Sequence, residues 1–87
     1  MIVKIVRAAI KDHDGRVYSV PKPGRHDTVI HLMATMGVQT PITGKQGFLT
    51  NQWQFVDRHE AKRIAAAANQ LLPREAGKDE LFSEDVW

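Results

Sequence analysis

The sequence contains no cysteine among its 87 residues. The chain therefore forms no disulfide and offers no thiolate ligands for a structural zinc site. The absence is typical of proteins that work in a reducing compartment, so we expect a cytoplasmic protein. A chain of this length folds as one small domain with a limited core. We expect residues 1–87 to form that single domain, for which oligomerisation is the remaining common way to add buried apolar area.

Long apolar runs are also missing. No stretch approaches the roughly 20 apolar residues that cross a bilayer. The apolar N-terminal segment is interrupted by Lys4, Arg7 and Lys11, whereas a signal peptide needs an unbroken apolar centre. We therefore expect no association with membranes, and we interpret this segment as part of the folded protein.

The sequence has no recognisable set of catalytic or metal-binding residues. The four histidines are at positions 13, 26, 31 and 59. No pair has the His-x-x-x-His spacing of a helical metal site, and no serine has the context of a nucleophile. The Gly44-Lys45 pair is not a P-loop, because Gln46 stands where the metal-binding hydroxyl belongs. We expect no enzymatic activity, no metal and no cofactor.

The charges that are present are distributed unevenly. Residues 1–74 hold 11 Lys and Arg against 5 Asp and Glu, a net charge of +6. Residues 75–87 hold 1 against 5, a net charge of −4. A basic body is typical of proteins with anionic partners such as nucleotides. The acidic tail either shields that body, pairs with a neighbouring subunit or is simply solvated.

Alternating and β-branched residues predict four strands. We expect a strand over 2–10, a turn at 12–15 and a second strand over 17–20 that closes a hairpin. A loop at 43–47 then leads to a short strand over 48–50, and a turn at 51–52 leads to a returning strand over 53–56. The pattern predicts a small antiparallel sheet.

Two segments have helical periodicity. Residues 26–36 place Val29, Ile30, Met33 and Met36 on one face, and Gly37 is a natural stop. The second helix begins after Asp57, with an apolar stripe that continues to Leu72 before Pro73 ends it. Asp57 and Glu60 have the spacing of a helix cap, which we favour over paired carboxylates for acid–base chemistry. We therefore predict an α+β fold, in which a small N-terminal antiparallel β-sheet packs with two main α-helices.

A few residues are candidates for contact with an anion. Arg25 and Arg58 suit bidentate recognition of phosphate, and Arg58 lies in the first turn of a helix, where free amides favour anions. His26, beside Arg25, is either a ligand donor or a surface histidine near a helix start. Phe48 and Trp53 either stack on a base or pack in the core. Positive charge and aromatic rings without a catalytic set favour binding over chemistry.

Six short segments occur in order along the chain: R-A-A-I-K (7–11), G-R-H-D (24–27), I-T-G-K-Q-G-F-L-T (42–50), F-V-D-R-x-E-A (55–61), N-Q (69–70) and L-F-S-E-D-V-W (81–87). This ordered set resembles small phage proteins of the Thoeris anti-defence sponge family. The resemblance covers most of the chain.

The resemblance implies an N-terminal antiparallel sheet packed with C-terminal helices, and assembly into dimers and higher homo-oligomers. It also implies a non-enzymatic protein of the infected bacterial cytoplasm. Such sponges sequester cyclic ADP-ribose-type signals intact, and some also hold cyclic oligonucleotides of the CBASS defence system. Within the matching segments, the residues expected to contact the ligand are Arg25, His26, Phe48, Arg58, Asn69 and Gln70.

Two other classes of function remain open. A phage protein that inhibits a host defence protein by direct binding, as anti-CRISPR proteins do, would suit the small size and the acidic, aromatic tail equally well. The other class is a nucleic-acid binder, which the basic body allows. We favour it less and do not expect nucleic acid as the partner, because the sequence has no recognition motif and its charge excess is modest.

Overall fold

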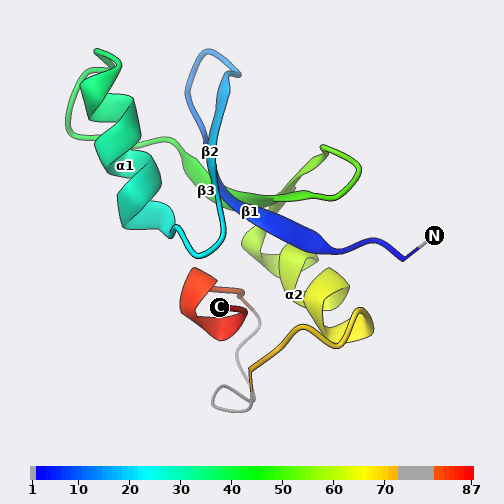
Figure 1. The fold of residues 1–87 in the computed structure, drawn as a ribbon. Coiled ribbons are helices and arrows are strands. Elements are labelled where there is room, and N and C mark those ends of the chain that lie inside the picture. The colour runs from blue at the N-terminus through cyan, green and yellow to red at the C-terminus, as the bar shows by residue number, and fades with distance from the viewer. Residues whose placement is uncertain (1, 73–79) are drawn as a thin grey trace.

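The computed structural model of the chain describes residues 2–72 and 80–87. It confirms the predicted α+β fold, with a four-stranded antiparallel sheet of order β2-β1-β3-β4 and two α-helices (Figure 1). The elements are β1 (Ile5–Lys11), β2 (Val17–Pro21), α1 (His26–Thr35), β3 (Lys45–Thr50), β4 (Phe55–Asp57), α2 (Arg58–Ala67) and a short 3-10 turn, η1 (Ser83–Asp85).

Strand β1 is central to the sheet and pairs on both sides. It pairs with β2 through the predicted hairpin, and with β3 in a register that sets Ala8 beside Phe48. An irregularity in the pairing between Ile5 and Arg7 shifts the register at the start of β1. The strand begins later than predicted, at Ile5. The returning strand was predicted from Trp53, but this residue belongs to the preceding turn.

Helix α1 begins and ends close to the predicted positions. Gly37 adopts a φ of 90°, and the amides of Gly37 and Val38 bond to the carbonyls of Ala34 and Met33 at 3.1 and 3.0 Å. This Schellman motif needs a residue that tolerates positive φ, which explains the glycine. The prediction that Met36 shares the buried face is wrong, because it lies at the helix end and is 62% exposed.

Helix α2 begins as predicted but ends early. The Asp57 carboxylate accepts a hydrogen bond of 2.8 Å from the Glu60 amide, which confirms Asp57 as the N-cap. The predicted continuation to Leu72 is wrong. Asn69 takes a φ of 58°, and the amides of Asn69 and Gln70 close a second Schellman motif. Pro73, expected to stop this helix, lies outside the described residues.

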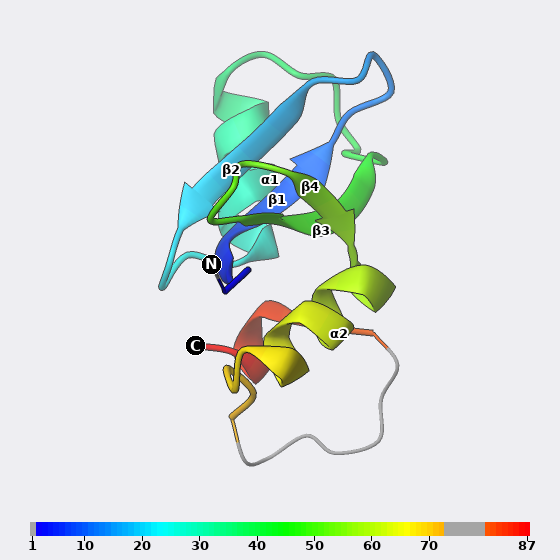
Figure 2. The ribbon, with the colours of Figure 1, turned by 90° about the vertical axis from the view of Figure 1, so that its right-hand side faces the viewer.

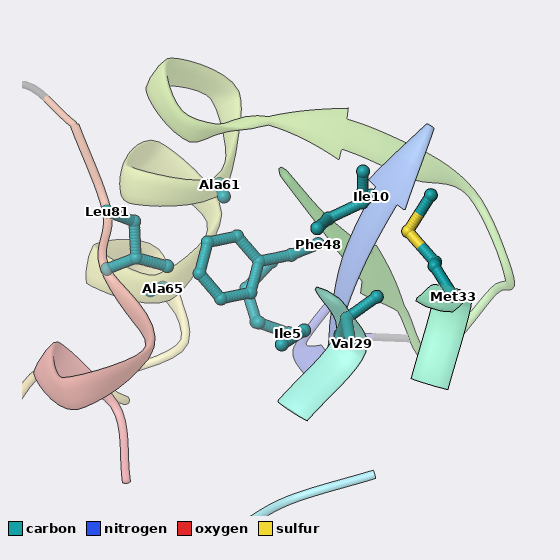
Figure 3. Packing of buried hydrophobic residues seen from close by; sticks show 9 residues of the cluster. Ile5, Ile10, Val29, Met33, Phe48, Ala61, Ala65 and Leu81 are labelled. Carbon is teal, nitrogen blue, oxygen red and sulfur yellow. The ribbon is translucent and has the colours of Figure 1, made fainter. Parts of the chain in front are cut away.

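The core lies between one face of the sheet and both helices. Phe48 is at its centre, with side chains from the strands, the helices and the C-terminal segment around it (Figure 3). The buried members are Ile5, Ala8, Ile10, Val29, Met33, Phe48, Ala61, Ala65 and Leu81. The two alanines of α2 let this helix approach the sheet closely.

The C-terminal segment packs against the domain, as the two aromatics near its end predicted. Leu81 is buried in the core, and the chain turns through η1 beside α2 and the start of α1 (Figures 1 and 2). The indole nitrogen of Trp87 donates a hydrogen bond of 2.8 Å to the Gly24 carbonyl. Residues 80–87 therefore complete the core.

Candidate functional site

A hollow of about 250 Å³ opens where the start of α1, the start of α2 and the C-terminal segment meet. Its lining residues are Arg25, His26, Asp27, Arg58, Phe82, Ser83 and Glu84. Three of the six predicted ligand residues come together here: Arg25, His26 and Arg58. Arg58 is far from the other two residues in sequence. The hollow is the best-supported candidate site.

Arg58 is the central cation of this region. Its Nη2 donates a hydrogen bond of 2.5 Å to the side-chain oxygen of Gln46, and its guanidinium carbon lies 4.4 Å from the centre of the Phe82 ring. Its Nε is buried without a hydrogen-bond partner among the described residues. Burial lowers the pKa of the Arg58 guanidinium, and the carboxylates of Glu80 and Glu84 oppose that shift. The guanidinium is thus partly desolvated and has one unused donor.

A second hollow, of about 510 Å³, adjoins Arg58. Its lining residues are Gly44, Lys45, Gln46, Asp57, Arg58, His59 and Glu80. Lys45 lies 3.9 Å from the Asp57 carboxylate at its edge. The backbone hydrogen bond from Glu60 lowers the pKa of Asp57, and Lys45 adds to the shift. Arg58 lines both hollows and is therefore the residue that the two have in common.

Arg25 joins the first helix to the C-terminal segment. Its Nη2 donates a hydrogen bond of 2.7 Å to the main-chain oxygen of Trp87. The last residue of the tail therefore lies beside Arg25. Asp27 and Glu84 line the same hollow and balance the charges of the two arginines.

His26 is a buried, neutral member of the site. Its Nε2 lies 2.7 Å from the Gly47 carbonyl oxygen, which only accepts, so Nε2 carries the proton and donates. Burial is the largest influence on the pKa of His26 and lowers it, and the hydrogen bond to Gly47 opposes this. The ring is 7% exposed. Because its donor is used within the protein, His26 is a poor donor to an anion.

Phe48, Asn69 and Gln70 lie elsewhere. The Phe48 ring is in the core, where it makes edge contacts with the rings of His26 and Trp87 at centroid distances of 4.9 and 6.4 Å. Asn69 forms the C-terminal cap of α2. The Gln70 side chain bonds to both the amide and the carbonyl of Ile5, each at 2.8 Å, and holds the start of β1. These three residues support the fold around the site.

Sequence reasoning missed two residues that shape the site, Phe82 and Gln46. The aromatic tail indicated that the C-terminus packs inward, but not that the Phe82 ring lies beside a particular guanidinium. Gln46 was assigned to a loop, whereas it belongs to β3 and binds Arg58. Both contacts join segments far apart in the chain, so no local pattern reveals them.

Two features are absent from residues 2–72 and 80–87. No cluster of three or more His, Asp or Glu side chains there has the arrangement of a metal site. No helix in these ranges is long and apolar enough to cross a bilayer.

The fold and the site define a small α+β protein with a hollow beside its second helix, where two arginines and two carboxylates line the same space. The chain belongs to the phage T4 y16D protein family, whose family-wide pattern matches residues 4–87. This agrees with the resemblance to phage proteins. No curated protein and no solved structure matches the chain significantly.

Proposed function

We propose that this protein binds a small anionic, base-containing ligand and holds it intact at the two hollows beside Arg58. The observation that carries the proposal is the state of that guanidinium. It is partly desolvated, and its Nε is buried without a partner in the described part of the chain. Its hydrogen bond and its ring contact are with neutral groups, Gln46 and the Phe82 ring, while the carboxylates of Glu80 and Glu84 act on it at longer range. An anion in either hollow would supply a close charge partner for this guanidinium.

The size of the site favours a compact nucleotide. Ligand pockets commonly measure about 300–1,000 Å³, so the smaller hollow lies just below this range and by itself has room only for part of a nucleotide, such as a phosphate with a ribose. The two hollows, of about 250 and 510 Å³, meet at Arg58. A ligand with two phosphates joined to a ring would span both, with Arg58 at its centre and Arg25 and Lys45 at its two ends. Phe82 supplies aromatic surface at the same place.

The ligand class we favour is the cyclic ADP-ribose type of immune signal, with cyclic oligonucleotides as the related class. This choice rests on the resemblance to Thoeris anti-defence sponges and on membership in a phage protein family. A sponge acts by affinity alone, since it must only keep the signal from its effector. A neighbouring subunit in a homo-oligomer would enclose hollows that are open on one chain.

The test is to mix the purified protein with cyclic ADP-ribose isomers and with cyclic di- and trinucleotides. Unbound ligand is removed, the protein is denatured by heat, and the released compounds are identified by mass spectrometry. Release of an intact cyclic nucleotide supports the proposal. A linear product would show an enzyme instead. If nothing is retained and a single host protein co-purifies, the function is direct inhibition of that protein.

Variants at the site make the test specific. Arg58→Gln should weaken binding of the retained ligand by about 10- to 150-fold, because a charged hydrogen bond contributes roughly 1.5–3 kcal/mol. Arg63→Gln is the matched control, since Arg63 is exposed on α2 and pairs with Glu60. Glu84→Gln removes a carboxylate from the hollow and should tighten binding by about threefold. Equal affinities for the Arg58→Gln and Arg63→Gln variants would refute the assignment of the site.

A further inference from the structure

The face of the sheet opposite the helices carries cationic and aromatic side chains that the proposed ligand site does not explain. Along β1, Ala8 and Ile10 enter the core with the helices, so alternation directs Arg7 and Lys11 to the other face. The buried side chains of both α1 and α2 belong to the same core cluster. Within the described ranges, side chains of the strands and of the turn between β3 and β4 therefore form this second face.

Trp53 is the most unusual residue of this face. The residue is 68% exposed, although a large aromatic residue is normally mostly buried. Its φ of 61° lies in the left-handed region, which is unfavourable for a bulky residue. The Arg7 guanidinium lies 5.5 Å from the ring centre. Two unfavourable features at one residue, exposure and backbone strain, indicate that the ring has a binding role.

A second pair of the same kind lies further along the face. The Lys11 ammonium is 5.8 Å from the centre of the Phe55 ring. This ring lies over Gly47, where an added Cβ would approach the Phe55 Cζ to 2.6 Å. The missing side chain lets the ring lie close to the sheet. The face thus has the same arrangement twice, a cation of β1 beside an aromatic ring from the turn before β4 or from β4 itself.

The two cations are available to an external anion. Arg7 uses its Nε to donate a 2.9 Å hydrogen bond to the Ser19 hydroxyl. Its Nη nitrogens have no hydrogen-bond partner, and Lys11 has no ion pair, within residues 2–72 and 80–87. Lys45 is the neighbour of Lys11 across the sheet, and it pairs with Asp57. The face therefore carries an excess of positive charge.

We propose that this face binds single-stranded nucleic acid, with bases stacked on Trp53 and Phe55 and phosphates held by Arg7 and Lys11. Stacking on sheet aromatics beside a cationic track is a general way to bind single strands with little sequence preference. A duplex does not present its base faces. A second copy of this face would bring like charges together. An acidic peptide would satisfy the cations but would not require the exposed indole.

The test is fluorescence anisotropy with a fluorescein-labelled oligo-dT of about 12 nucleotides, titrated with the full chain at several salt concentrations. The affinity should fall as salt rises. Trp53→Asn should weaken binding by roughly 5- to 150-fold. Asparagine tolerates positive φ better than tryptophan, so this variant should melt no lower than the parent. Combined Arg7→Gln and Lys11→Gln should reduce the salt slope by about 1.4.

The control for charge is Arg63→Gln, which removes an exposed arginine from α2. It should leave both the affinity for oligo-dT and the salt slope near those of the parent. Binding of oligo-dT by Trp53→Asn as tightly as by the parent would overturn the proposal. Displacement of the oligonucleotide by polyglutamate, with no effect of Trp53→Asn, would also overturn it and would identify the face as a docking surface for an acidic protein.

Discussion

At the scale of single residues, His26 connects the candidate site to the stability of the fold. Its ring donates to Gly47, contacts the Phe48 ring and lines the hollow beside Arg58. Its position at the start of α1 was evident from the sequence, but its burial was not. A histidine beside an arginine in a polar segment has the local appearance of a surface residue.

The lowered pKa of His26 predicts a pH dependence of stability. Between the lowered pKa of the folded state and the ordinary value of 6.5, the ring binds a proton in the unfolded chain and stays neutral in the folded chain. The free energy of unfolding should therefore fall as the pH drops from 6.5 towards the lowered pKa. Urea denaturation at a series of pH values should show this slope, and His26→Gln should flatten it.

The matched control is His31→Gln, at an exposed position of α1. It should leave the slope of the parent in place. A slope that persists in the His26→Gln variant would show that other groups cause it. Asp57 affects stability at lower pH. Its pKa is lowered from 3.8, so its contribution to the free energy of unfolding is lost only as the pH falls below that value.

At the scale of elements, some ends of the helices and strands were predicted correctly from the sequence and others were not. The Asp57 cap and the Gly37 stop are local signals, and both were identified correctly. The end of α2 was missed because Asn69 is a weaker stop signal than glycine, and the apolar pattern continues beyond it. Asparagine at the end of a helical pattern was the available clue.

For the candidate site, too, the sequence identified some residues and did not decide the location of others. Arg25 and Arg58 were predicted from their charge, and Arg58 also from its place in the first turn of a helix. Phe48 and Trp53 had two alternatives each, and the sequence did not decide between them. The structure places Phe48 in the core and Trp53 on the surface, because register and turn geometry decide which face of a sheet a residue occupies.

The link between α2 and β1 yields a prediction for Gln70. Its two hydrogen bonds to the Ile5 backbone join segments at opposite ends of the sequence. Gln70→Ala should lower the free energy of unfolding by about 1–3 kcal/mol, because it removes partners from half-buried backbone groups. Urea denaturation measures the change. Gln39→Ala, at an exposed position, should have little effect, and equal losses would contradict the assigned role.

At the scale of the whole molecule, the C-terminal segment and the sheet should unfold together. Leu81 lies in the same core cluster as Phe48, and Trp87 bonds to Gly24. We therefore expect one cooperative transition for residues 1–87. In a Trp53→Phe background, Trp87 fluorescence reports on the docked segment and far-UV circular dichroism reports on the sheet and helices. Midpoints that differ would show that the segment detaches first.

Gly47 belongs to both surfaces of the molecule. On one side its carbonyl anchors the His26 ring, and on the other its bare α-carbon leaves room for the Phe55 ring. Any larger residue there would disturb the two surfaces at once, whichever ligands they bind.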